Sequence, residues 1–430
     1  MSVSVALTSR GMLAASQLGM MACIAVLLAP DEQGYLATAR SLLGLQVVLE
    51  LGFSAVLVQV FAHERARNER DSSRPLRLGH ILRLSMWWFF GVAVVMIFGI
   101  STVGHFVMAA HDHTNPSINL APWLLSVAAA SLGVMLLPLQ SLIEGSGHVV
   151  SIALMRGVQA LTGLAAFAIV AILGKGLWAL PALIAAPVFA GILWLWIGHR
   201  RDLWTAWCNR PEEGISWRDE IFPFQWRIAL SWACGWAIFQ LNIPVLFSSH
   251  GPIVAGQMGL TLDACTGITS IGMAWIAIKA PGWGRLIALG NHERVDVEYA
   301  QATRHAILAV FVVAVAFVGV VFMLRLFSHP LAERFLPPLP LVLLVGAALL
   351  NQSVFAMASY LRAHKQEPFL VTSVAGAVLL VAWALWGGAR FGALGMAIAY
   401  LATTVVIGFV WGGAIFRRCR RTWHAESAAP

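Results

Sequence analysis

The feature that most limits the fold of this chain is a succession of long apolar segments that contain almost no charge. The first, Gly11–Ala29, has no charged residue at all. A membrane-spanning helix needs about 20 mostly apolar residues. Only 11% of the 430 residues are charged, against roughly 25% in soluble domains. The sequence therefore predicts an all-α polytopic membrane protein, and Gly11–Ala29 is interpreted as a retained first span rather than a cleaved signal.

Charged residues and Pro or Gly breaks divide the apolar segments into twelve predicted transmembrane helices. These are expected near residues 11–30, 35–62, 84–108, 121–143, 150–173, 177–198, 221–247, 252–279, 304–327, 336–361, 367–388 and 391–416.

The positions of Lys and Arg predict the orientation. With both termini in the cytoplasm, 23 of the 28 basic residues fall on the cytoplasmic side, as the positive-inside rule requires. The net charge of +8 is thus explained by short basic loops, and a nucleic-acid partner is not expected.

The twelve helices are expected to form two six-helix bundles related as a parallel repeat. The segment around Gly176 resembles that around Gly392, and the same offset aligns His148 with His364. Such repeats are common in transporters. We predict an N-terminal bundle over 1–199, a cytoplasmic linker over 200–220, a C-terminal bundle over 221–416 and a basic cytoplasmic tail over 417–430.

Two carboxylates lie inside predicted spans, where an ionisable group costs about 2.5–3.5 kcal/mol. Glu50 is expected near the middle of the second helix, with Gln46 and Ser54 one turn to either side. Asp263 is expected midway along the eighth helix, on a face rich in Gly, Thr and Ser. Each is a candidate site for a coupling cation. The alternative for each is a hydrogen-bonded carboxylate that serves packing alone.

Several cationic and amide side chains are candidates for substrate binding. Arg156 and Arg40 are expected within the fifth and second helices, and Arg227 at the start of the seventh. Guanidinium groups bind phosphate through paired hydrogen bonds. The alternative is that their long side chains reach the lipid headgroups. Asn242, which precedes Pro244, is expected to open a helix toward a substrate, although Pro in a membrane helix often only kinks it.

Metal, cofactor and nucleophile motifs are not expected to define a site. The five Cys are scattered without a CxxC spacing, so neither a disulfide framework nor a zinc site is indicated. The cluster His111-Asp112-His113 lies in a predicted loop without further ligands nearby in the sequence. No phosphate-binding Gly loop or catalytic elbow is present, and we expect neither a cofactor nor enzymatic activity.

Two stretches of the chain resemble the polysaccharide transporter (oligosaccharide flippase) family of the multidrug/oligosaccharidyl-lipid/polysaccharide exporter superfamily. They are APDEQGYLATARSLLGLQVVLELGFSAVLVQVFAHE (Ala29–Glu64) and YLRAHKQEPFLVTSVAGAVLL (Tyr360–Leu380), the latter followed by Gly388–Leu401. The resemblance implies a flippase that moves a lipid-linked glycan of the polyprenyl diphosphate type across the inner membrane by alternating access. Relatives of this family hold the sugar-diphosphate head in a cationic cavity while the lipid tail stays among membrane lipids.

On this interpretation, Arg156, Arg40 and Arg227, with Gln46 and Asn242, bind the substrate. Glu50 and Asp263 bind the coupling cation, a proton or sodium. Two alternatives remain. A cation-coupled multidrug exporter of the same superfamily would need an acidic, apolar cavity. A membrane-embedded polysaccharide polymerase or acyltransferase would need a larger outer loop than this chain has.

Overall fold

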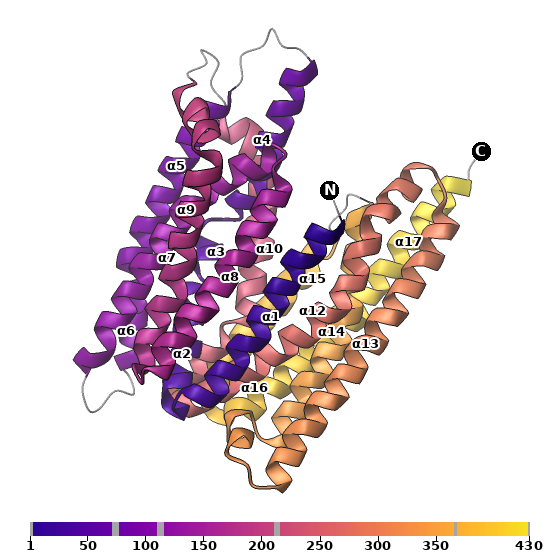
Figure 1. Ribbon diagram of the computed structural model, residues 1–430. Helices are drawn as coiled ribbons and strands as arrows, with labels where there is room; N and C mark the ends of the chain where they lie inside the picture. Colours follow the sequence, from indigo (N-terminus) through magenta and orange to yellow (C-terminus); the bar gives the residue numbers. More distant parts are fainter. Residues whose placement is uncertain (1–2, 71–76, 110–115, 210–215, 365–367, 429–430) are drawn as a thin grey trace. The chain divides into compact units, whose positions relative to one another are not determined.

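The computed structural model describes residues 3–70, 77–109, 116–209, 216–364 and 368–428, and these residues form helices joined by short turns, without a β-strand (Figure 1). Their contacts divide the chain into two compact units, Met1–Trp236 and Ala237–Pro430. The division falls inside one helix. The predicted limits of the bundles, the linker and the tail stay a prediction, since part of 200–220 lies outside the described residues.

The first unit contains the helices of the predicted N-terminal bundle and two elements that follow it, η3 and most of α10. They are α1 (Val3–Leu27), α2 (Pro30–Leu43), α3 (Gln46–Leu49), α4 (Phe53–Arg70), α5 (Leu78–Val95), η1 (Met96–Ile100), α6 (Ser101–Ala109), α7 (Pro116–Gly145), α8 (Val149–Ile172), η2 (Gly176–Trp178), α9 (Ala179–Cys208), η3 (Trp217–Ile221) and the greater part of α10 (Phe222–Phe239).

The second unit contains the remaining helices. They are α11 (Asn242–His250), α12 (Pro252–Ala288), α13 (His292–Leu326), η4 (Pro330–Arg334), α14 (Pro338–Ala363), α15 (Leu370–Trp383), η5 (Ala384–Gly388), α16 (Ala389–Thr403), η6 (Thr404–Trp411) and α17 (Gly412–Ala428).

The structure confirms the predicted class of fold. Ten helical segments are long and apolar enough to cross a membrane, and the bent pair Pro30–Leu49 and Phe53–Arg67 would make an eleventh. A shorter apolar segment, Gly11–Leu27, lies in α1. In chain order, every predicted span falls on one of these segments. The chain is therefore a multi-pass membrane protein, while the side on which its termini lie stays a prediction.

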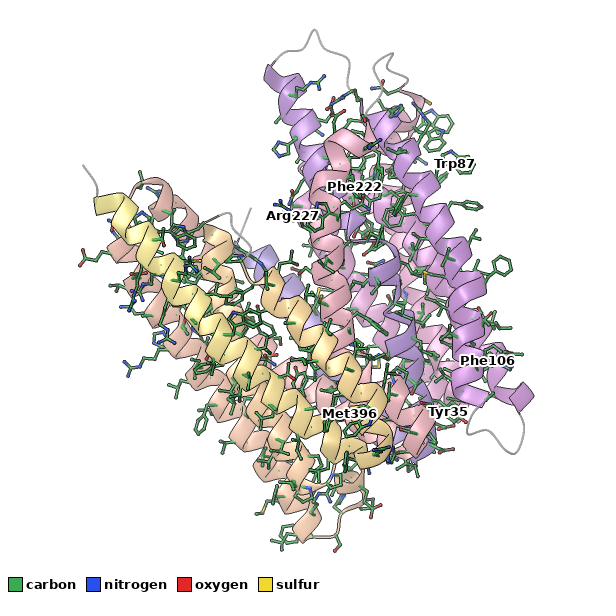
Figure 2. All side chains as sticks on the ribbon, turned by 180° about the vertical axis from the view of Figure 1, so that it is seen from behind. Tyr35, Trp87, Phe106, Phe222, Arg227 and Met396 are labelled. Atoms are coloured by element: carbon green, nitrogen blue, oxygen red, sulfur yellow. The ribbon has the colours of Figure 1, made fainter. Side chains whose placement is uncertain are left out.

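Apolar side chains cover the outward faces of the helices, as expected of surfaces in contact with lipid. Trp87 and Phe106, labelled in Figure 2, are 74% and 70% exposed. In the second unit, Phe327 on the end of α13 is 78% exposed. A soluble protein seldom leaves so many large apolar side chains uncovered, so these faces are consistent with a bilayer environment.

Small residues allow the helices of the first unit to approach closely. A Cβ at Gly145 of α7 would lie 2.7 Å from the Cβ of Phe61 on α4, and a Cβ at Gly157 of α8 would lie 3.0 Å from the sulfur of Met12 on α1. Ser16 Oγ on α1 also donates to the carbonyl of Ala160 on α8 (2.8 Å). These contacts are typical of membrane helices, which pack through small residues.

The proposed repeat has one conformational match. Gly176 (φ +44°) and Gly392 (φ +57°) were aligned by sequence alone, and both have a positive φ. Gly176 lies in the turn between the fifth and sixth predicted spans, whereas Gly392 lies at a kink inside α16, near the start of the twelfth predicted span. Glycine adopts a positive φ without the steric cost that a Cβ imposes. The match is limited to the sign of φ, and the repeat stays a prediction.

Candidate functional site

The second predicted span is interrupted at Glu50. The structure corrects the expectation of a continuous helix: α2, α3 and α4 are separate, and the segment bends by 42°. The break is made by Leu51 (φ +53°) and Gly52 (φ +63°), both left-handed. This conformation costs an L-residue such as Leu51 roughly 1–2 kcal/mol. The stripe of Gln46, Glu50 and Ser54 therefore does not run along one helix.

The carboxylate of Glu50 is enclosed at this break. Glu50 is 3% exposed, and its Oε2 has no hydrogen-bond partner among the described residues. Its other polar contact is a hydrogen bond with Ser54. A buried polar atom without a partner usually costs 1–3 kcal/mol, and its retention points to a functional role. Such an atom can take up a proton or a cation.

The walls around the break are apolar and tightly packed. A Cβ at Gly52 would lie 2.4 Å from Cγ2 of Ile228 on α10. Trp236 on the same helix donates from Nε1 to the carbonyl of Ser41 (3.1 Å). The ring of Phe53, which begins α4, stacks on Phe89 at 5.9 Å. The break is thus held in place by α10 and α5.

Substituting Gly52 by Ala tests whether this break is fixed by the backbone. The new Cβ would meet Ile228 and force a left-handed conformation on an L-residue, so we expect a loss of about 1–2 kcal/mol in stability. Thermal unfolding of the purified protein in detergent measures the change. Gly91→Ala in α5, where no atom lies within 4 Å of the added Cβ, should be neutral or stabilising. Equal unfolding temperatures of Gly52→Ala and Gly91→Ala would contradict the expectation.

A second cluster of charges lies farther along α4, around Arg77. The guanidinium contacts two carboxylates: Nη2 lies 3.1 Å from Oε2 of Glu64 and 3.1 Å from Oε2 of Glu220. Nε also donates to Glu64 Oε1 (3.2 Å), and Nη1 to Glu220 Oε1 (3.3 Å). The hydrogen bonds that Arg77 donates to Glu64 are the largest influence on its pKa and raise it, so this side chain stays charged at physiological pH.

These charges line a cavity with a volume of about 270 Å³. Its wall on α4 is one helical face, because the residues are spaced by three or four positions. The lining residues are Val56, Gln59, Val60, His63, Glu64, Arg67, Arg77 and Glu220. The two acids of this lining, Glu64 and Glu220, offset the charge of its two arginines, Arg67 and Arg77. The cavity therefore carries no excess of positive charge from these four side chains.

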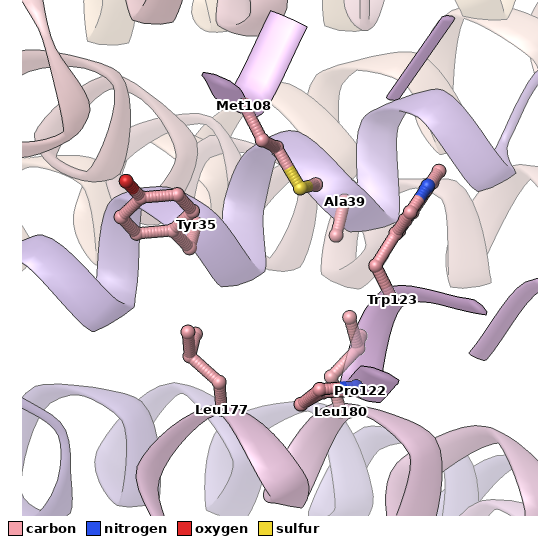
Figure 3. A pocket seen from close by; sticks show the side chains of 7 residues that line it. All are labelled: Tyr35, Ala39, Met108, Pro122, Trp123, Leu177 and Leu180. Atoms are coloured by element: carbon pink, nitrogen blue, oxygen red, sulfur yellow. The ribbon is translucent and has the colours of Figure 1, made fainter. Parts of the chain in front are cut away.

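A second hollow in the first unit is too small for a substrate. It measures about 10 Å³, and Figure 3 shows its apolar lining from α2, α6, α7, η2 and α9. That volume is near the minimum needed for one water molecule. The lining residues are Tyr35, Ala39, Met108, Pro122, Trp123, Leu177 and Leu180.

The predicted cationic residues of the first unit do not form one cluster. Arg156 is 49% exposed and is paired with Glu144 at the end of α7, with Nη2 2.6 Å from Oε2. Arg40 is exposed near the end of α2. Arg227 is exposed on α10, its guanidinium 5.5 Å from the centre of the Trp226 ring. Gln46, half-buried on α3, is next to Glu50 through the backbone bond from Glu50 N to Gln46 O (2.8 Å).

In the second unit, Asp263 is half-buried on α12. Asn242 is 4% exposed and begins α11, after an interruption of the helix at residues 240–241. Its amide lies 3.5 Å from the carbonyl of Ile238. The helix is therefore interrupted before Pro244, whereas the opening toward a substrate and the binding roles of Asn242 and Asp263 stay predictions. His111–His113 lie outside the described residues.

Sequence inspection missed the two most connected charge clusters. Arg77 was counted only as a basic loop residue, and Glu64 was named only as the last residue of the stretch Ala29–Glu64. In the second unit, Asp296 on α13 accepts from Tyr360 Oη (2.8 Å) and from Arg420 Nε on α17 (2.9 Å). Their partners are distant in sequence, so no spacing signals them. The signal available was an acid just beyond the apolar part of a predicted span, as at Glu64.

Comparison with known proteins assigns the class of fold. No known protein family and no curated protein matches the sequence. Among solved structures, the chain is similar to the MATE multidrug transporter DinF-BH, with a TM-score of 0.64 and 13% identity over 98% of this chain and 95% of that one. Its fold is that of the MATE and related transporters of the MOP superfamily.

Two further structures share this fold. One is the lipid II flippase MurJ in an inward closed conformation, with a TM-score of 0.59 and 11% identity over 99% of this chain and 91% of that one. The other is a MOP superfamily transporter from Pyrococcus furiosus, with a TM-score of 0.54 and 15% identity over 96% of this chain and 94% of that one. All three are transporters or flippases, and none is an enzyme.

Proposed function

We propose that this protein is a transporter of the bacterial inner membrane that flips a lipid-linked oligosaccharide or a related envelope polysaccharide intermediate by alternating access. The observation that carries the proposal is the broken second span with its enclosed Glu50 carboxylate. This break lies within Ala29–Glu64, the segment that resembles polysaccharide transporters. A fold shared along nearly the whole chain with MurJ, a lipid II flippase, agrees with a lipid-linked substrate.

Glu50 and Asp263 are assigned to the coupling cation, a proton or sodium. The Oε2 of Glu50, which has no hydrogen-bond partner among the described residues, gains an interaction when a cation binds and loses it on release. A ligand moves a conformational equilibrium only through a difference in affinity between the two states. Opening and closing of the break at Leu51 and Gly52 provides such a difference, since it changes which atoms surround Glu50.

The headgroup is assigned to arginine side chains that are now paired with carboxylates. Arg–carboxylate and Arg–phosphate pairs have the same forked geometry, so a diphosphate competes with Glu144 for Arg156 and with Glu220 for Arg77. Glu220 is 41% exposed, which leaves it free to move aside. Arg40 and Arg227, with Gln46 and Asn242, are assigned to the remainder of the substrate path.

The test is surface glycan display in a strain that lacks the native gene and expresses either wild type or a variant. Asp263→Asn and Arg156→Ala should each reduce display at normal protein levels, because each removes a charge that binds cation or headgroup. Arg390→Ala is the matched control: Arg390 is exposed, and its guanidinium lies over the Trp386 ring at 5.0 Å. Normal display in both site variants would remove these residues from the mechanism.

A cation-coupled multidrug exporter is the second candidate, favoured by the likeness to DinF-BH. The balanced charges around Arg77 also suit a site that does not attract anions. Export of a cationic dye from membrane vesicles, with no effect of the gene on surface glycan, would favour this candidate over the flippase.

A further inference from the structure

Two histidines and an aspartate of the first unit meet where α8 begins and α9 nears its end. His148 immediately precedes α8, while His199 and Asp202 lie one turn apart on α9. One possible ligand atom from each lies within 4.8 Å of the others. The two imidazole rings are 5.1 Å apart and inclined by 70°. No residue of this cluster has a part in the proposed transport mechanism.

His199 is fixed in position by buried hydrogen bonds. It is 7% exposed, and its Nε2 lies 2.8 Å from Oγ of Ser151 on α8. The indole of Trp194 donates to the same Oγ (3.0 Å). Since a hydroxyl oxygen has two lone pairs, Ser151 can accept from both Trp194 and an Nε2–H of His199. In this tautomer, Nδ1 of His199 presents a lone pair.

That lone pair lies toward a carboxylate, with Nδ1 3.5 Å from Asp202 Oδ2. A charge-assisted hydrogen bond would be about 2.7–2.9 Å long. Two ligands at about 2.0–2.1 Å from a tetrahedral zinc ion are about 3.3 Å apart. The separation is therefore nearer to that of two metal ligands than to that of a strong hydrogen bond. His148 and Asp202 are exposed, so small side-chain rotations can bring the third ligand into place.

We propose that His148, His199 and Asp202 form a binding site for a divalent transition metal of the zinc type. Two imidazoles and a carboxylate suit such metals better than calcium or magnesium, which prefer oxygen ligands. The buried bond from His199 to Ser151 orients the ring, as outer partners of metal ligands commonly do. Three protein ligands leave a fourth position for water. The bound metal would link the start of α8 to the end of α9.

The experiment is a titration of the purified full-length protein in detergent with Co²⁺, followed by visible absorption, and then with Zn²⁺ in competition. The wild type is expected to give the intense bands of four-coordinate Co²⁺ at one equivalent, and Zn²⁺ should remove them. Asp202→Asn and His148→Ala, both at exposed positions, should lose the bands and weaken binding at least tenfold. His305→Ala, an exposed histidine on α13, is the control and should behave as wild type.

Thermal unfolding gives a second measurement. Zn²⁺ should raise the unfolding temperature of the wild type and of His305→Ala, because a ligand of the folded state stabilises it, but not that of Asp202→Asn. If the wild type shows only weak octahedral absorption, or if Asp202→Asn and His148→Ala bind as well as the wild type, the proposal fails. The cluster would then be a neutral relay in which Ser151 donates to His199 and His199 donates to Asp202.

Discussion

Glu50→Gln is expected to lower transport about tenfold or more while leaving the protein folded. The amide has nearly the size of the carboxylate, so the packing against Ser54 and the break at Leu51 are retained. It carries no charge and cannot bind and release a coupling proton or cation. The coupling free energy between two bound ligands is typically about 1–3 kcal/mol. A loss of about 1.4 kcal/mol of this coupling free energy corresponds to the expected tenfold decrease in transport. Uptake of the substrate into vesicles under an imposed proton or sodium gradient measures it.

Glu333→Gln is the matched control for this substitution. Glu333 is exposed in η4, and its backbone carbonyl, rather than its side chain, accepts from Gln257. Its variant should transport as the wild type does. The thermal unfolding of Glu50→Gln should be unchanged or improved, because a buried charge is removed. Gradient-driven transport at wild-type rates in Glu50→Gln would exclude Glu50 from coupling.

Arg77→Ala is expected to destabilise the first unit by about 3 kcal/mol, the scale found when one partner of a buried ion pair is removed. Arg77 and Glu64 have side chains that are only 10% and 6% exposed. Without the guanidinium, the buried Glu64 loses its closest partner and keeps only Arg67, whose Nη1 is 3.8 Å from its Oε2. The link between α4, the start of α5 and η3 is also lost. Thermal or denaturant unfolding in detergent, with expression level as a supporting measure, reports the loss.

Two further variants distinguish the loss of the buried Arg77–Glu64 ion pair from the general effect of removing one positive charge. Arg294→Ala removes a 68% exposed arginine whose Nε is 3.5 Å from Glu298, and such a surface pair contributes at most about 1 kcal/mol. Arg77→Ala combined with Glu64→Gln should recover part of the stability, since the unpaired charge is gone. A loss no larger than that of Arg294→Ala, or no recovery in the double variant, would show that the Arg77 cluster does not hold the unit together.

The helical segments could be predicted from sequence because each is decided locally. A stretch such as Gly11–Ala29, with no charge, must satisfy its backbone hydrogen bonds internally when it lies in lipid, and a helix does this within one segment. The prediction failed where the backbone departs from this rule. Residues 35–62 looked like one span, but the left-handed conformations at Leu51 and Gly52 divide it. Gly44 and Gly52 are the residues there that signal a break, since Gly44 directly follows α2 and Gly52 directly precedes α4.

The candidate site was only partly predictable. Glu50 was identified because a carboxylate in an apolar segment is unusual whatever its neighbours are. The pairing of Arg156 with Glu144 was not predicted, because it joins α8 to α7 across a turn. The Arg77 cluster was not predicted either, because Glu220 is separated from Arg77 by 143 positions in the sequence.

The sequence by itself determined that this chain lies in a membrane as many apolar helices, since that outcome depends on the transfer of each segment from water to lipid. It also determined which residues are costly to bury. Only the tertiary structure decided which of those residues are enclosed, which are paired and which stay exposed. The reason is that an ion pair such as Arg77–Glu220 depends on distances of a few ångströms between helices, and these are set by packing contacts that no single segment contains.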